Sequence, residues 1–125
     1  MKNSASFKDL EVWQEAVNLT DMVYRQTRKF PQEELFALTN QIRRAVVSIP
    51  SNIAEGSGRR SNTEFLQFLS IANGSLRELE TQLIIAERIG YLSHEQLYAL
   101  QPRIDTVGRL LTGLRNYLKK TTARS

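Results

Sequence analysis

Apolar residues along this chain recur at intervals of three and four, and no segment alternates with a period of two. A three-and-four spacing is the signature of amphipathic helices, whereas strict alternation marks half-buried strands. The pattern predicts four helices, over about residues 9–29, 33–57, 62–89 and 94–119. With 125 residues, the whole chain, 1–125, is expected to form one domain.

The third and fourth predicted helices carry the clearest signals. Each opens with a capping box, Ser61 with Glu64 and Ser93 with Gln96, in which the two residues satisfy free amides of the first turn. The apolar residues of the third helix follow an unbroken heptad: Phe65, Leu69, Ala72, Leu76, Leu79, Leu83 and Ala86. Those of the fourth do the same: Leu97, Leu100, Ile104, Val107, Leu111, Leu114 and Leu118. Gly90 provides the stop between them.

The first two helices are less regular. The predicted inner stripe of the first helix is Leu10, Trp13, Val17, Thr20 and Tyr24, widened by Ala16 and Val23. The second helix is expected to bury Leu38, Ile42, Ala45, Val46, Ile49 and Ile53. Pro50 in this helix and Pro102 in the fourth interrupt the pattern without changing its phase, so a bend is expected at each and not a break.

Short connections require consecutive helices to run in opposite directions, so the expected fold is all-α, an antiparallel up-down-up-down four-helix bundle. This topology places the second connection and both chain termini at one end. Eight basic residues are expected to gather there: Lys2, Lys8, Arg59, Arg60, Arg115, Lys119, Lys120 and Arg124. The chain as a whole carries 17 Lys and Arg against 13 Asp and Glu.

Two interpretations of this basic end remain open at the level of sequence. Clustered Lys and Arg bind phosphates with release of counterions, which favours a nucleic-acid interface. Alternatively, these residues are simply solvated in a loop and at a helix C-terminus, where cations suit the helix dipole. No aromatic residue interleaves with the cluster in the sequence, so a platform for stacking single-stranded bases is not expected.

Chemistry typical of enzymes is missing from the sequence. The chain has no cysteine and a single histidine, His94, so neither a metal cluster nor a catalytic triad is expected. Glu78 and Glu80 are two residues apart and hence on different faces of a helix, which makes them poor partners for acid–base work. We expect a non-enzymatic protein without a cofactor. The absence of a long apolar run and of a signal-peptide core favours a cytoplasmic protein without a membrane span.

Small and charged residues inside the helices raise a further question. Gly74, Gly108 and Gly113 cost helix stability, which suggests close approach by a helix of the same bundle or of another subunit. Arg43 and Arg44 lie on the second helix, and Arg44 is expected to lie opposite Gly74 and Ser75. A long arginine there would either form an interhelical charge pair with Glu78 or Glu80 of the third helix or contact a ligand.

Four segments resemble a known family: Phe7-x-x-Leu10-x-Val12-Trp13-Gln14-x-Ala16, Gln41-Ile42-Arg43-Arg44-Ala45, Ser48-Ile49-Pro50-x-Asn52-Ile53-Ala54-Glu55-Gly56 and Gly74-Ser75-x-x-Glu78-Leu79-Glu80. They are similar to the bacterial four-helix bundle proteins encoded by intervening sequences of 23S ribosomal RNA genes, over about residues 7–118. The resemblance implies the same bundle and a homopentameric ring. It also implies a relation to the accessory proteins of diversity-generating retroelements, which bind a reverse transcriptase and nucleic acid.

These observations lead to two hypotheses of function. The first is an oligomer that binds RNA or DNA, with the phosphates contacted by Arg59, Arg60, Arg115, Lys119 and Lys120, helped by Arg43 and Arg44. The second is a scaffold or accessory subunit for a reverse transcriptase or another nucleic-acid enzyme. Structural or interface roles are expected for Asn52, Glu55, Gly74, Ser75, Glu78 and Glu80.

Overall fold

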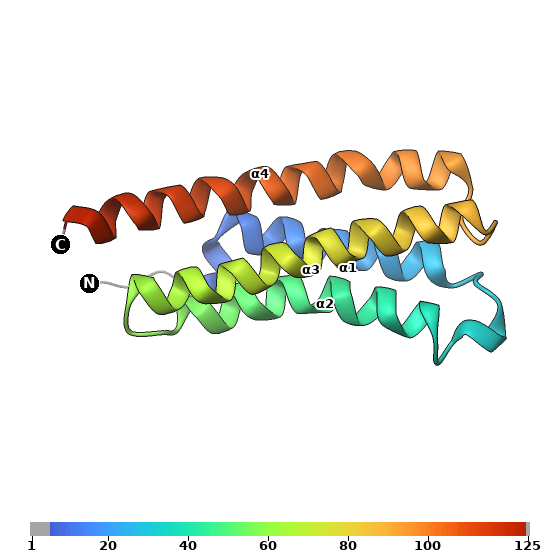
Figure 1. Cartoon of the computed structure of the whole chain (residues 1–125), viewed down its shortest axis with the longest axis horizontal. Helices are drawn as coiled ribbons and strands as arrows, with labels where there is room; N and C mark the ends of the chain where they lie inside the picture. The colour runs from blue at the N-terminus through green and yellow to red at the C-terminus, as the bar shows by residue number, and fades with distance from the viewer. Residues whose placement is uncertain (1–5, 125) are drawn as a thin grey trace.

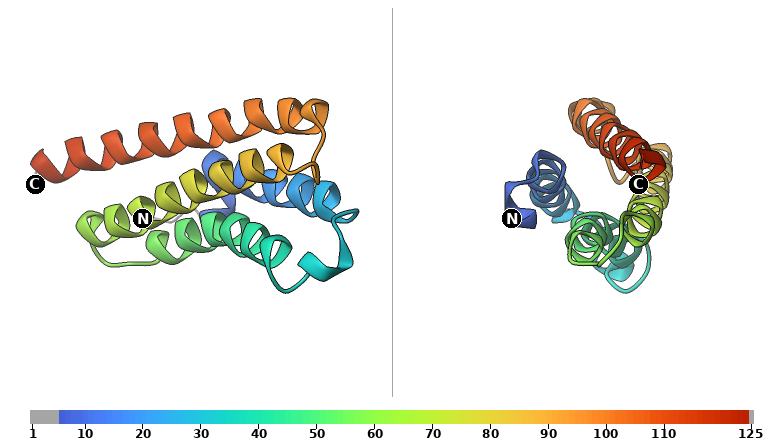
Figure 2. Two further views of the ribbon diagram at one scale, coloured as in Figure 1. Left: turned by 45° about the vertical axis from the view of Figure 1, so that its right-hand side comes forward. Right: turned by 90° about the vertical axis from the view of Figure 1, so that its left-hand side faces the viewer.

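The computed structural model describes residues 6–124, and this part of the chain contains four long helices and no strand. The helices are α1 (Glu11–Thr27), α2 (Leu38–Ser57), α3 (Asn62–Arg88) and α4 (His94–Arg124). They run up, down, up and down (Figure 1). Each packs against two others, α1 and α3 both lying between α2 and α4. Seen along their length, the four surround a common centre (Figure 2). The predicted all-α bundle is confirmed.

The core is built from the predicted heptads of α3 and α4. Every predicted apolar position of these two helices is buried or half-buried, and most are inaccessible to solvent. The capping box of α4 forms in full, because Ser93 and Gln96 exchange two bonds. At the start of α3, Ser61 acts as the predicted N-cap, since its Oγ accepts from the Glu64 amide. Gly90, with φ +89°, ends α3 in the left-handed conformation that favours glycine.

The buried stripe of α1 differs from the predicted one. The buried residues are Val12, Ala16, Leu19, Val23 and Thr27, whereas Val17 and Tyr24 are more than a third exposed. Helix α1 carries apolar residues on two adjacent faces, and the spacing of either face is helical. Only the position of the neighbouring helices decides which face enters the core. The prediction was correct for Ala16 and Val23, and wrong for Val17 and Tyr24.

Helix α2 begins at Leu38, five residues later than predicted. Residues 32–34 form a short 3-10 turn, and Ala37, with φ −125° and ψ −108°, interrupts the helical path. Glu34 stabilises the helix start from outside, because its Oε1 accepts from the amide of Leu38. Glu34 thus caps the N-terminus of α2 from outside the helix and does not belong to its first turn.

The remaining boundaries are close to the prediction. Helix α1 is two residues shorter at each end, and α3 ends one residue earlier. Helix α4 continues to Arg124, beyond the predicted end at Lys119, and the Thr122 hydroxyl donates to the Leu118 carbonyl in this last turn. Both α2 and α4 run through their proline without a break.

Tyr91, in the α3–α4 connection, contacts the α1–α2 connection at the same end of the bundle. Its hydroxyl donates to Glu34 Oε2 at 2.9 Å, and its ring packs against Phe30. The hydrogen bond to Glu34 raises the pKa of Tyr91, and desolvation and the charges of Glu34 and Glu33 raise it further.

We expect this raised pKa to make the fold sensitive to alkali. The folded protein keeps the phenol proton to a higher pH than the unfolded chain does, whose tyrosine pKa is about 10. The contribution of Tyr91 is therefore fully present below pH 10 and is lost as the pH rises through the folded-state value. Urea unfolding between pH 7 and 11 measures this loss. Tyr91→Phe should flatten the decline, and the matched variant of the exposed Tyr98, Tyr98→Phe, should not.

Candidate nucleic-acid interface

Five of the predicted phosphate-contacting residues lie at one end of the bundle. Arg59 and Arg60 occupy the turn between α2 and α3, and Arg115, Lys119 and Lys120 lie in the last turns of α4. The turn and the C-terminal end of α4 lie at the same end of the molecule (Figure 1). We call these five residues the basic pole. Of the other expected members, Lys8 belongs to the 3-10 turn before α1, Lys2 lies outside the described residues, and the side chain of Arg124 is not described.

The charges of the basic pole are mostly uncompensated. Within residues 6–124, an acidic partner within 4.0 Å is found only for Arg59, whose Nη2 lies 2.6 Å from Glu55 Oε2. Lys119, Lys120 and Arg60 are exposed. Arg115 is half-buried, and its Nε has no hydrogen-bond partner. Exposed cations without an acidic partner are free to bind an anion.

Aromatic side chains accompany the basic pole, contrary to the expectation from sequence. The guanidinium of Arg59 lies over the ring of Phe68, 4.8 Å from its centroid, and Tyr117, close to Lys119 on α4, is 64% exposed. The expectation failed for Phe68 because it lies on α3, and only the fold brings it back beneath the turn. Tyr117 is next to the basic residues in the sequence and was overlooked.

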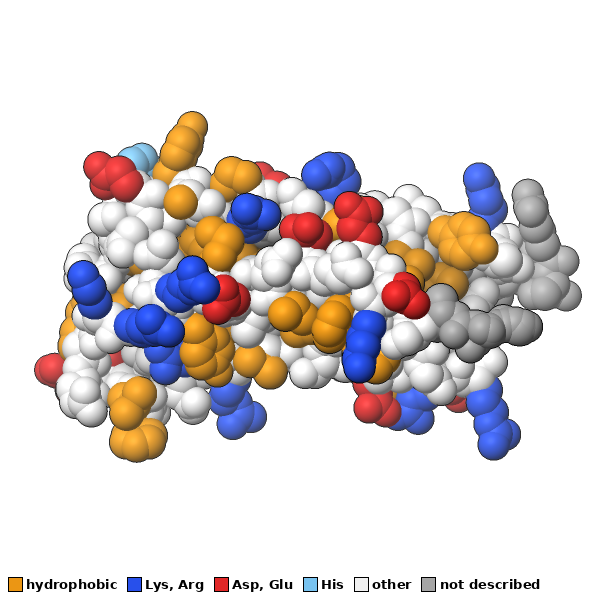
Figure 3. All heavy atoms as spheres, turned by 180° about the vertical axis from the view of Figure 1, so that it is seen from behind, with side chains coloured by type: hydrophobic (Ala, Val, Ile, Leu, Met, Phe, Trp, Pro, Cys, Tyr) orange, Lys and Arg blue, Asp and Glu red, His pale blue; other side chains and the backbone are white. Residues whose placement is uncertain are grey.

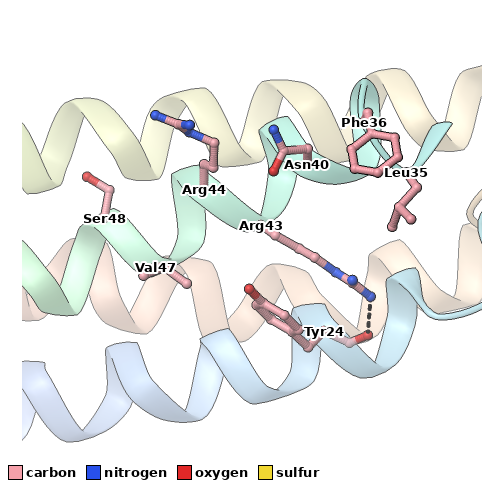
Figure 4. A pocket seen from close by; sticks show the side chains of 8 residues that line it. All are labelled: Tyr24, Leu35, Phe36, Asn40, Arg43, Arg44, Val47 and Ser48. Atoms are coloured by element: carbon pink, nitrogen blue, oxygen red, sulfur yellow. Dashed lines mark hydrogen bonds between the residues drawn. The ribbon is translucent and has the colours of Figure 1, made fainter.

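Arg43 and Arg44 are not part of the basic pole. They lie near the start of α2, and 15 residues separate Arg44 from Arg59, which corresponds to roughly 22 Å of helix. Arg43 binds α1: its Nε donates to Thr27 Oγ1 at 3.0 Å, its Nη2 donates to the Tyr24 carbonyl, and it lies over the Tyr24 ring (Figure 4). The expected pairing with a glutamate of α3 is wrong for Arg43, because the side chain turns toward α1.

Arg43 and Arg44 instead border a groove between α1 and α2 with a volume of about 540 Å³. It is lined by Tyr24, Leu35, Phe36, Asn40, Arg43, Arg44, Val47 and Ser48 (Figure 4). We call it the α1/α2 groove. From behind, Lys and Arg side chains gather among hydrophobic ones toward the end with the α1–α2 connection (Figure 3). The groove was not predicted from the sequence, because Tyr24 was assigned to the inner stripe of the first helix.

Two of the predicted structural residues, Asn52 and Ser75, meet at Ser48 between α2 and α3. Ser48 Oγ and Ser75 Oγ are 2.8 Å apart, and the Asn52 side chain donates to both the hydroxyl and the carbonyl of Ser48. Glu78 and Arg44 line a notch beside this pair, but no ion pair joins them among the described residues. Glu80 points to the other side of α3, where it binds Arg77 and accepts from Gln101 of α4.

Four glycines inside the helices differ in what a Cβ atom added at their position would meet. A Cβ on Gly108 would lie 3.1 Å from the end of the Arg77 side chain, whereas one on Gly74 or Gly113 would meet nothing within 4 Å. Close helix packing occurs instead at Gly56, where a Cβ would lie 2.7 Å from Phe68 Cβ. No packing role was predicted for Gly56 from the sequence.

Other kinds of site are not seen in the described part of the chain. Residues 6–124 contain no group of three or more His, Cys, Asp or Glu side chains able to hold a metal ion. None of their helices combines the length and the hydropathy needed to cross a bilayer.

Comparison with known proteins identifies a family and a solved structure with a similar fold. A family model described as 23S rRNA-intervening sequence protein matches residues 8–113. A 1.70 Å crystal structure of a protein of unknown function from the S23 ribosomal protein family of Bacteroides thetaiotaomicron has a similar fold, with a TM-score of 0.77. The two sequences are 23% identical, and the similarity covers 83% of this chain and 97% of that one. Among curated proteins, no match was found.

Proposed function

Since this chain belongs to the 23S rRNA-intervening sequence protein family, we propose that it is a non-enzymatic protein that binds RNA or DNA through its basic pole. The observation that carries the proposal is the set of uncompensated charges at this end. Arg60, Lys119 and Lys120 are exposed and have no acidic partner within 4.0 Å in the described part of the chain. Such groups gain affinity for phosphates by releasing counterions.

The geometry favours contacts with the phosphate backbone over recognition of base sequence. The five residues of the basic pole come from a helix end and a turn, two separate segments of the chain. Lysine and arginine contacts to phosphates position a protein without reading sequence. Binding is therefore expected to tolerate different sequences, with the exposed ring of Tyr117 available to stack on an unpaired base.

The proposal includes self-association, because family resemblance implies a homopentameric ring. In a ring whose axis runs along the bundles, all copies present the basic pole on the same side. Five copies would then combine five sets of uncompensated charges on one face, and such a field strengthens and accelerates the binding of a polyanion. A cytoplasmic location belongs to the same proposal.

A salt series tests the proposal. We expect the full chain to bind fluorescent duplexes of about 20 base pairs of RNA or DNA at 50 mM salt and to lose affinity steeply by 200 mM. Fluorescence anisotropy measures both. If binding were absent at 50 mM salt, or if the affinity did not change with salt, the basic pole would not be a phosphate-binding surface.

A second candidate function is a scaffold or accessory subunit for a nucleic-acid enzyme such as a reverse transcriptase. The α1/α2 groove favours it, because it exposes apolar side chains that a protein partner can cover. Affinity capture with and without nuclease separates the two functions. An enzyme that stays bound after complete digestion supports the scaffold, whereas one released by nuclease supports nucleic-acid binding.

A further inference from the structure

Within residues 6–124, the α1/α2 groove leaves apolar side chains exposed to solvent. Leu35 is 38% exposed, Val47 39% and Phe36 91%, and these side chains border the groove together with Tyr24. Arg44, at the same border, is exposed and has no ion pair within residues 6–124. The groove is thus a concave apolar surface with an unpaired positive charge.

A second apolar surface without a cover lies along α3. Four exposed residues of α3, together with Ile89 directly after its last residue, lie on one stripe. Successive helical residues turn by about 100°, and the spacing of these positions keeps them within roughly 60° of one another. These residues, the α3 ridge, are Ile71, Gly74, Glu78, Ile85 and Ile89. The three isoleucines are between 44% and 52% exposed. This surface is convex, carries a negative charge at Glu78, and is lowest at Gly74.

We propose that the α3 ridge of one copy of this chain lies in the α1/α2 groove of the next. A groove cannot pack against its own copy, since both surfaces are concave, but a helix with apolar side chains fits it. The contact joins two different surfaces and is therefore head-to-tail, which generates a closed ring or a filament. This inference rests on the self-association included in the proposed function and specifies which faces meet.

The α3 ridge and the α1/α2 groove lie at the same height along the bundle axis. The bond between Ser48 and Ser75 marks one level shared by α2 and α3. Because α2 and α3 are antiparallel, residue numbers rise along α3 and fall along α2 in the same direction. Three residues after Ser75 comes Glu78, level with Ala45 of α2, which is next to Arg44. Ten residues after Ser75 comes Ile85, level with Leu38 of α2, just after the exposed Leu35 and Phe36.

Matching levels are what rotation about an axis along the bundle requires, because such a rotation keeps every residue at its height. The ridge of the next copy would then bring Glu78 to Arg44, and Ile85 and Ile89 to the exposed end of the groove. The same rotation points every basic pole in one direction, which the proposed binding face requires.

The chain offers a matched pair of variants to test the contact. Ile84 and Ile85 are adjacent on α3 and similarly exposed, 38% and 44%, but Ile84 lies about 100° away from the ridge. Mass is measured by light scattering after size exclusion. We expect wild type to be an oligomer, Ile85→Lys to shift to monomers, and Ile84→Lys to keep the wild-type mass. Helical content by circular dichroism should be the same in all three.

Charge reversal tests the polar part of the contact. Arg44→Glu and Glu78→Arg should each weaken assembly at least tenfold in the concentration at which oligomers dissociate, and the double variant should restore most of it. If wild type were a monomer, the proposed self-association would fail together with this inference. If wild type were an oligomer and Ile85→Lys kept its mass, only the assignment of the faces would be overturned.

Discussion

Replacing Gly56 by alanine is expected to destabilise the bundle by about 1–3 kcal/mol, although alanine favours a helix over glycine by about 1 kcal/mol. Gly56 is buried in α2. A Cβ at this position would lie 2.7 Å from Phe68 Cβ and 2.8 Å from Phe65 Cδ1. Because Phe68 Cβ is attached directly to the backbone of α3, it cannot rotate away, and the two helices must separate. Urea unfolding followed by circular dichroism measures the loss.

Gly113→Ala is the matched control for this experiment. Gly113 is also inside a helix, but it is exposed, and a Cβ there would meet nothing within 4 Å. We expect this variant to be more stable than wild type, by up to about 1 kcal/mol. Equal stabilisation by both substitutions would mean that α2 and α3 do not approach closely at Gly56.

The second large effect concerns the basic pole. Changing Arg60, Lys119 and Lys120 together to glutamine should lower the affinity for a 20-base-pair duplex roughly 10- to 100-fold at 50 mM salt. Each phosphate contact contributes about 0.9 to the slope of log affinity against log salt. Loss of three contacts should therefore reduce that slope by up to about 3 per bound chain. The same anisotropy assay gives both quantities.

The control must remove the same charge from elsewhere on the molecule. Arg28, Lys29 and Arg88 are exposed and lie near the opposite end of the bundle, so their change to glutamine lowers the net charge equally. We expect this control to keep an affinity within about threefold of wild type and nearly the full slope. Equal losses in both triple variants would show that binding depends on net charge and not on the basic pole.

Local signals in the sequence predicted most of the fold. The capping boxes at Ser61 and Ser93 and the heptads of α3 and α4 depend on residues within one or two turns, so they could be read directly. The start of α2 could not, because Glu34 stabilises it across the irregular residue Ala37 and not from inside the helix. The buried stripe of α1 depends on where α2 and α4 lie, and no local pattern contains this information.

The candidate sites were predictable to a smaller extent. Topology was sufficient to bring the α2–α3 turn and the end of α4 to one pole, because it requires only the order and direction of the helices. The position of Arg43 was not predictable, since its choice of Tyr24 and Thr27 depends on which face of α1 is turned outward. The α1/α2 groove was missed for the same reason.

The hydroxyl pair of Ser48 and Ser75 has a consequence for how α2 and α3 can slide past each other. Apolar heptads repeat, so two helices packed only through them can shift by a turn, about 5.4 Å, and regain similar contacts. After such a shift, the buried Ser75 would lose its partner on α2, at about 1–3 kcal/mol for the unsatisfied hydroxyl, whereas the bonds from Asn52 to Ser48 lie within α2 and would persist. The Ser48–Ser75 pair thus selects one alignment out of several, much as a single buried asparagine does in a coiled coil.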